Sequence, residues 1–88
     1  MTRHEYRVVT VYSDEYMNMG RIMGFNPGTN WSVYNTYRTR SGARGQATWA
    51  INEQRSVSPE DRRYKAVRVE HWDAVNGNWE VLDERSID

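Results

Sequence analysis

The chain has 88 residues, with 12 basic and 12 acidic side chains and no cysteine. This length favours one domain over residues 1–88, and the lack of cysteine excludes disulfides, thiol nucleophiles and thiolate zinc sites. The sequence contains no run of about 18 apolar residues, which is the length needed to span a membrane. The N-terminus also lacks the apolar region of a signal peptide. These features favour a cytoplasmic protein, or a virion-associated one if the chain comes from a phage.

Tyrosine, tryptophan and arginine are over-represented. The chain has 4 Trp and 6 Tyr against 1 Phe, and 11 of its 12 basic residues are Arg. Tyr and Trp rings suit a small core and also a contact surface where one end of the ring meets water. Arginine pairs with carboxylates, phosphates and aromatic rings through a planar group of donors. A GC-rich genome would produce the same arginine excess, so composition leaves both interpretations open.

Charge is uneven along the chain. Residues 26–50 carry Arg38, Arg40 and Arg44 without any acidic residue, whereas residues 51–88 carry 6 basic and 9 acidic side chains. A basic middle and an acidic end create potentials that steer partners even at zero net charge. Either two copies dock basic face to acidic face, or the two segments pair within one sheet.

The first elements are predicted to be a strand and a helix. Residues 6–13 are β-branched and aromatic, as in a strand with both faces partly covered. Ser13 or Asp14 then provides an N-cap for a helix over 14–23, whose stripe of Tyr16, Met19 and Met23 suits packing on a sheet. Gly24 ends the helix and residues 26–28 form a turn.

The middle of the chain is predicted to be a hairpin. Residues 30–40 form a strand with Trp31, Val33 and Tyr37 on one face and Tyr34, Arg38 and Arg40 on the other. Residues 41–45 contain two glycines, and this pattern predicts a hairpin loop. The third strand, over 46–53, points Ala47, Trp49 and Ile51 inward.

The last part of the chain is predicted to hold one short helical turn and a second hairpin. Ser58 and Pro59, followed by two acids, indicate the turn. Strands over 64–73 and 78–83 join through Asn76-Gly77, a strong two-residue hairpin signal. A strict two-residue turn places Trp72 opposite Val81, and a bulge near Glu70 would bring the apolar residues of the first strand onto one face.

The predicted fold is therefore a single small α+β domain with about five mostly antiparallel strands and one helix packed on a sheet face. Eight apolar residues from the strands and the helix are expected to supply most of its core: Val9, Val11, Met19, Met23, Trp31, Trp49, Val67 and Trp79.

The sequence offers little for catalysis. His4 and His71 are the only histidines, and neither has metal-ligand spacing. No nucleophile elbow, phosphate loop or dinucleotide fingerprint occurs. Asp73 and Glu80 form a candidate carboxylate pair, but such cross-strand acids are usually solvated. We expect a protein that is not an enzyme and that uses no cofactor, metal or small-molecule substrate.

Nucleic-acid binding is the alternative hypothesis. A single-strand groove needs aromatic rings beside guanidinium groups, and the predicted hairpin 34–44 presents Tyr34, Arg38, Arg40 and Arg44 on its outer face and tip. A sequence pI of about 6.7 argues against it, since dedicated nucleic-acid-binding domains are strongly basic.

The favoured hypothesis is a small protein-binding module that binds another protein or forms a homo-oligomer. Trp, Tyr and Arg dominate the energetics of protein interfaces. The candidate binding residues combine exposed rings with the basic segment, and they are Tyr34, Tyr37, Arg38, Arg40, Arg44 and Trp72.

Two resemblances accompany this hypothesis. A small, cysteine-free chain rich in Arg and Trp resembles the accessory proteins of bacteriophages in general character. That likeness implies an inhibitor of a host protein, or a virion or assembly component. The opening strand of residues 5–9, with the helix and the Trp-containing strand after it, resembles small βαββ bacterial domains of unknown function over at most the first 55 residues. It carries over no functional residues.

Overall fold

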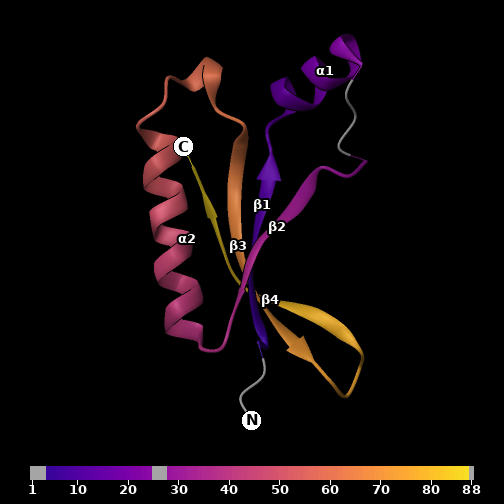
Figure 1. Cartoon of the computed structure of the whole chain (residues 1–88), viewed down its shortest axis with the longest axis vertical. Helices are drawn as coiled ribbons and strands as arrows, with labels where there is room; N and C mark the ends of the chain where they lie inside the picture. The colour runs from indigo at the N-terminus through magenta and orange to yellow at the C-terminus, as the bar shows by residue number, and fades with distance from the viewer. Residues whose placement is uncertain (1–3, 25–27, 88) are drawn as a thin grey trace.

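The computed structural model describes residues 4–24 and 28–87, which form a four-stranded sheet with α-helices (Figure 1). Its elements follow in the order β1 Tyr6–Tyr12, α1 Asp14–Met23, β2 Trp31–Tyr37, α2 Arg40–Arg55, the 3-10 turn η1 Pro59–Asp61, β3 Tyr64–Asp73 and β4 Asn78–Ser86. The strands pair antiparallel in the order β2-β1-β3-β4. The α+β class and the antiparallel sheet are confirmed. The expected five strands and one helix are four strands and two α-helices in the described residues.

The largest correction concerns α2, which replaces the predicted loop over 41–45 and the predicted strand over 46–53. The Thr39 hydroxyl caps the helix by accepting a hydrogen bond from the backbone N–H of Gly42 at 3.0 Å. A Cβ at Gly42 would lie 2.9 Å from that hydroxyl oxygen, so glycine leaves room for the cap. The glycine that suggests a loop in the sequence is part of a helix start.

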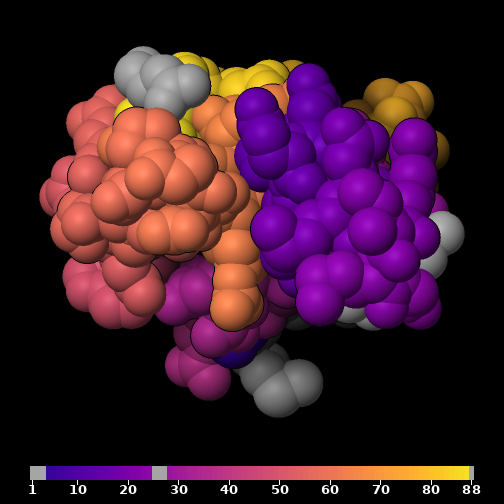
Figure 2. Space-filling model, turned by 90° about the horizontal axis from the view of Figure 1, so that it is seen from above, coloured from indigo at the N-terminus to yellow at the C-terminus, as the bar shows by residue number. Residues whose placement is uncertain are grey.

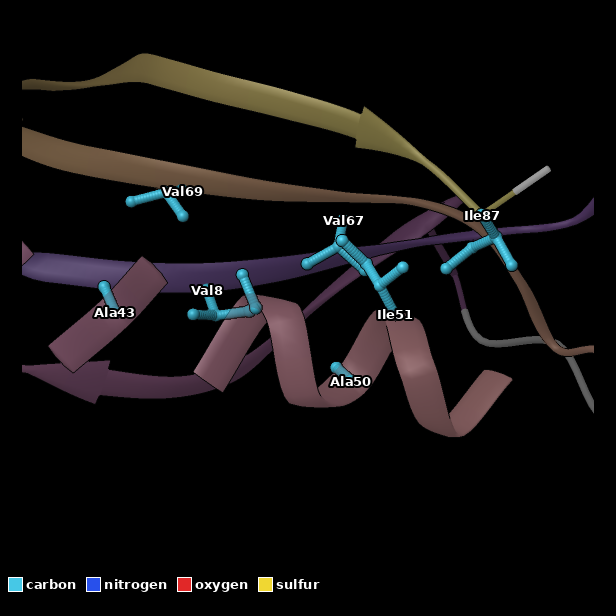
Figure 3. Close-up of a cluster of buried hydrophobic side chains, with 8 residues drawn as sticks. Val8, Ala43, Ala50, Ile51, Val67, Val69 and Ile87 are labelled. Carbon is cyan, nitrogen blue, oxygen red and sulfur yellow. The ribbon is translucent and has the colours of Figure 1, made fainter. Parts of the chain in front are cut away.

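The core lies between α2 and the sheet (Figure 3). Small side chains on one face of α2 let the helix approach the strands closely, and the buried cluster comprises Val8, Ala43, Ala47, Ala50, Ile51, Val67, Val69 and Ile87. Ile87 follows β4 and is 1% exposed, so it anchors the chain end against the core. Arg55 holds the same segment by donating from Nε to the Ile87 carbonyl at 2.8 Å.

The predicted core is only partly correct. Val9, Val11 and Val67 are buried as expected, but Val9 and Val11 do not belong to the cluster under α2. The remaining predicted members are exposed or only half-buried, namely Met19, Met23, Trp31, Trp49 and Trp79. Small aliphatic residues, rather than the large rings, fill the space under α2.

Helix α1 begins and ends as predicted but packs differently. The Ser13 hydroxyl accepts from the backbone N–H of Tyr16 at 3.1 Å, and Gly24 ends the helix in the left-handed region with φ 84°. The helix lies past the end of β1, and seen from above it stands on the other side of β3 from α2 (Figure 2). Gly20 is its only buried residue, so the predicted methionine stripe stays exposed. The predicted turn over 26–28 falls outside the described residues except for Gly28.

Strand β2 is shorter than predicted and irregular. It ends at Tyr37 instead of residue 40. Its register against β1 shifts between Val8 and Val9, so that Asn35 and Val33 take successive partners and Tyr34 is the extra residue. This bulge reverses the alternation, and Tyr37 packs against the core under α2 instead of sharing a face with Trp31.

The β3–β4 hairpin has the register shift expected near Glu70 but not its expected result, and the turn also differs. The shift lies between Val69 and Glu70, with Leu82 of β4 as the extra residue, so β3 keeps its alternation and Val67 and Val69 stay on the opposite face from Trp72. Residues 74–77 form a longer loop, which places Trp72 opposite Trp79 and Asp73 opposite Asn78. The Asp73 carboxylate accepts from the backbone N–H of Val75 at 3.0 Å and so organises this loop. The short helical turn is confirmed as η1.

Candidate interaction surface

The six predicted binding residues do not form one site. Tyr34 lies on β2, where its ring centroid is 6.5 Å from that of Trp49 on α2. Tyr37 packs against the core, and Trp72 lies on β3. The hairpin that was expected to join Tyr34 to Arg44 does not exist, because α2 begins at Arg40.

The three predicted arginines lie around the start of α2. Arg38 donates from Nε to the His4 ring at 3.3 Å, and Arg40 and Arg44 belong to the first turns of the helix. All three are exposed. The acidic C-terminal segment reaches the same helix, since Arg85 of β4 donates to the Thr48 hydroxyl at 3.1 Å.

The sheet face that points away from α2 is a second apolar surface. Side chains alternate between faces along a strand, so this face, which we call the open face, is made by residues that the α2 cluster excludes. Its members are Arg7, Val9 and Val11 of β1, Trp31, Val33 and Thr36 of β2, Ala66, Arg68, Glu70 and Trp72 of β3, and Trp79, Val81, Glu84 and Ser86 of β4.

The rim of the open face is exposed although it is apolar. Val33 and Val81, on the two edge strands, are 43% and 48% exposed. Trp31 and Trp72 keep more than a third of their surfaces in contact with solvent. Val9 and Val11, at the centre, are buried. The open face is thus a preformed apolar surface without a covering layer in the described residues.

Arg7 holds the open face together. Its guanidinium carbon lies 4.3 Å from the ring centroid of Trp79 and 5.4 Å from that of Trp31. Its Nε donates to the Glu70 carboxylate at 2.6 Å. The two side chains are only 16% and 6% exposed, so this is a largely buried ion pair stacked between two indole rings. The cluster continues to Trp72, which meets Trp79 edge-on at 5.4 Å.

The charges of the open face are paired within the chain. Besides Arg7 and Glu70, the face carries Arg68 and Glu84, whose Nε and Oε1 atoms are 3.5 Å apart. The Nε atom of Arg68 is buried and makes no hydrogen bond within the described residues, so the ion pair with Glu84 is its polar interaction. The surface therefore carries no net charge and has few polar groups left to satisfy.

Sequence reasoning missed most of this surface. Arg7 and Glu70 each interrupt an apolar strand, and charged residues in such positions are normally paired. That signal predicts a buried ion pair between two neighbouring strands. Trp31 and Trp79 were assigned to the core, and only the tertiary structure shows that they stack on the other side of the sheet.

The perturbed ionisable groups are not members of the open face. Hydrogen bonds from the Asn76 side chain and from the loop backbone lower the pKa of Asp73. Burial raises the pKa of Tyr37 and of Tyr64. Within residues 4–24 and 28–87, no group of three or more His, Asp or Glu side chains comes together in a way that could hold a metal ion. In the same part of the chain, neither helix is long and apolar enough to cross a membrane.

Two clefts lie elsewhere on the molecule. One of about 420 Å³ separates α1 from η1, and another of about 380 Å³ lies between α2 and the sheet, beside Tyr34 and Trp49. Both are lined by acidic and basic side chains: Arg63 lines both clefts, Glu15 lines the first and Glu53 lines the second. The cleft beside α1 also contains Met19 and Met23, so its lining mixes charged and apolar side chains.

Comparison of the chain with protein-family models, with curated proteins and with solved structures finds no match. The proposal that follows therefore depends on the geometry of the open face.

Proposed function

We propose that this chain is a small non-enzymatic protein-binding module that binds its partner through the open face. The observation that carries the proposal is an apolar sheet face with exposed Trp31, Trp72 and Val81 and no covering layer in the described residues. Antiparallel sheets with one solvated face normally carry polar residues there. An apolar face of this kind marks an interaction site, and its Trp and Arg residues are those that contribute most to binding.

The chemistry of the open face defines the partner. Because Arg7 pairs with Glu70 and Arg68 pairs with Glu84, the face has no free charge with which to attract an acidic or a basic surface. The partner must therefore present an apolar, uncharged protein surface. A highly charged polymer would have to break these ion pairs in order to bind there.

The composition supports a narrower role. Small size, lack of cysteine and abundance of Trp and Arg suit an accessory protein of phage type, acting as an inhibitor of a host protein or as a virion or assembly component. A cytoplasmic or virion-associated location belongs to the same proposal.

Site-specific photo-crosslinking tests the binding surface. A photoreactive residue placed at Val81, which is 48% exposed on the open face, should form adducts with a protein partner in an extract of the source cells. The matched control is the same residue placed at Gln46, which is exposed on α2, on the other side of the molecule. Adducts from both positions alike, or from neither, would contradict the proposal.

Nucleic-acid binding is kept as a second candidate because of one observation. Arg38, Arg40 and Arg44 stay exposed together around the start of α2, whose first turn has no acidic residue. The partial positive charge of a helix N-terminus adds to theirs. The double variant Arg40→Ala, Arg44→Ala should then lose a salt-sensitive retention on a polyanion resin. Unchanged retention would exclude this end of α2 as a nucleic-acid site.

A further inference from the structure

We propose that the partner on the open face is a second copy of this chain, packed face to face about a two-fold axis. The inference rests on the proposed function, because it names the occupant of the same surface. A two-fold interface places one patch against its own copy, so the patch must be complementary to itself. The steps below show that the open face meets this condition.

The first step is chemical complementarity. The open face requires an apolar, uncharged partner surface, and the open face is itself such a surface. Arg7 and Glu70 neutralise each other within the chain, as do Arg68 and Glu84. Two copies therefore meet without the like-charge repulsion that usually prevents a charged face from pairing with itself. The exposed indole rings and the two half-exposed valines meet similar apolar groups.

The second step is the arrangement of layers. Sheets stack about 10 Å apart, with strands either nearly aligned or crossed near 90°. Helix α2 lies on the opposite side of the sheet from the open face (Figure 1). Two copies would give a helix, sheet, sheet, helix assembly. Each sheet would then be covered on both faces, and the exposed Val33 and Val81 at the rim of the open face would be buried.

The third step concerns the ends of the molecule. Helix α1 and the β3–β4 loop both extend to the side away from α2 (Figures 1 and 2). They carry Ile22 and Val75, which are 86% and 94% exposed. Because these projections stand at the two ends of the strands, they would meet the face of an aligned partner sheet, whereas a partner whose strands cross near 90° can lie between them. We therefore favour the crossed arrangement.

The test is the oligomeric state of the whole chain, measured by sedimentation velocity over a wide range of protein concentration. The wild-type chain should form a dimer that persists at high salt. Val81 lies opposite Glu70 in the sheet, and Arg7 already binds that carboxylate, so Val81→Arg adds a positive charge without a partner of its own. It should raise the dissociation constant by roughly 100-fold or more. Gln46→Arg adds the same charge to exposed α2 and should leave the dimer intact.

A second variant protects the test against misfolding. Val33→Arg charges the opposite edge of the open face, and Val33 is 43% exposed, so the fold tolerates the change. Circular dichroism confirms that each variant is folded. A dimer that survives both substitutions would overturn the inference, since it would form through another surface.

A chain that stays monomeric at every concentration would also overturn the second copy as partner. The proposed function would survive that result if crosslinking from Val81 captured a different protein. Loss of both the dimer and the Val81 adduct would contradict the proposed function itself. The two experiments therefore separate the failure of this inference from the failure of the protein-binding proposal.

Discussion

The two faces of the sheet have similar residues but different surroundings. Under α2, Val8, Val67 and Val69 are at most 1% exposed. On the open face, Val9 and Val11 at the centre are also buried, but Val33 and Val81 on the edge strands remain more than two-fifths exposed. The difference therefore lies at the rim, because the described chain supplies a helix for one face only. An apolar pattern on a strand thus shows that a face is to be covered, but not which molecule covers it.

The open face is nevertheless ordered by its own side chains. Arg7 lies between two indole rings and binds a carboxylate that is almost fully buried. Such an arrangement fixes the rotamers of Trp31 and Trp79 before a partner arrives. A surface that is already ordered loses less side-chain entropy on binding. The following predictions test whether the faces differ as this comparison requires.

Arg7→Ala should have the largest effect on folding. The change leaves the Glu70 carboxylate buried without its partner and removes the group between Trp31 and Trp79. Loss of one partner of a buried ion pair costs about 3–5 kcal/mol. Urea unfolding of the dilute protein would measure this loss in the free energy of unfolding.

The matched control is Arg68→Ala, on the same face. The ion pair of Arg68 with Glu84 is longer, at 3.5 Å, and its partners are 30% and 49% exposed. An exposed pair contributes about 0–1 kcal/mol. Equal losses for the two arginines would mean that the cluster around Arg7 has no special role in ordering the open face.

Ile51→Ala tests the covered face. Ile51 is 3% exposed in the cluster under α2, and truncation of such a residue costs about 2–5 kcal/mol. Val81→Ala on the open face should cost well under 1 kcal/mol in the monomer, because half of that side chain already contacts water. Thermal unfolding of both variants at low protein concentration measures the contrast. A similar cost for the two would mean that α2 does not distinguish the faces.

The sequence was a good guide to elements whose signals are local. The Ser13 cap and Gly24 stop delimit α1, and alternation marks β1 and β3. Helix α2 escapes prediction because its buried stripe consists mostly of alanines, which are weak hydrophobic signals, and because Gly42 is a residue typical of loops. Ala47, Trp49 and Ile51 also alternate with polar residues, which imitates a strand.

The candidate surface was less predictable than the fold. Of the six predicted binding residues, only Trp72 belongs to the open face. The position of Trp31 and Trp79 depends on which of two apolar faces receives α2, and this choice is made by long-range packing. The bulges in β2 and β4 add to the difficulty, because one extra residue moves the following side chains to the other face.

Trp49→Ala should have only a small effect, although the sequence placed this residue in the core. The Trp49 ring is 53% exposed and contacts Tyr34 across a cleft. We expect a loss of about 1 kcal/mol or less in the free energy of unfolding. Trp79→Ala is the matched comparison, because Trp79 stacks on Arg7 and should cost clearly more in the same urea titration. A larger loss for Trp49 would mean that the ring beside the cleft contributes more to stability than the tryptophan that stacks on Arg7.

The smallest effect concerns Asp73, in the loop that aligns Trp72 with Trp79. Its pKa is lowered by the Asn76 side chain, which donates to the carboxylate at 2.7 Å, and by backbone N–H groups. Because folding lowers this pKa, the loop gains order above the ordinary carboxyl pKa and loses it as pH falls through the lowered value. Asn76→Ala removes the strongest of these hydrogen bonds, so an NMR titration should show the Asp73 pKa moving upward. An unchanged pKa would assign the shift to the backbone N–H groups alone, and the register of the two tryptophans would then not depend on Asn76.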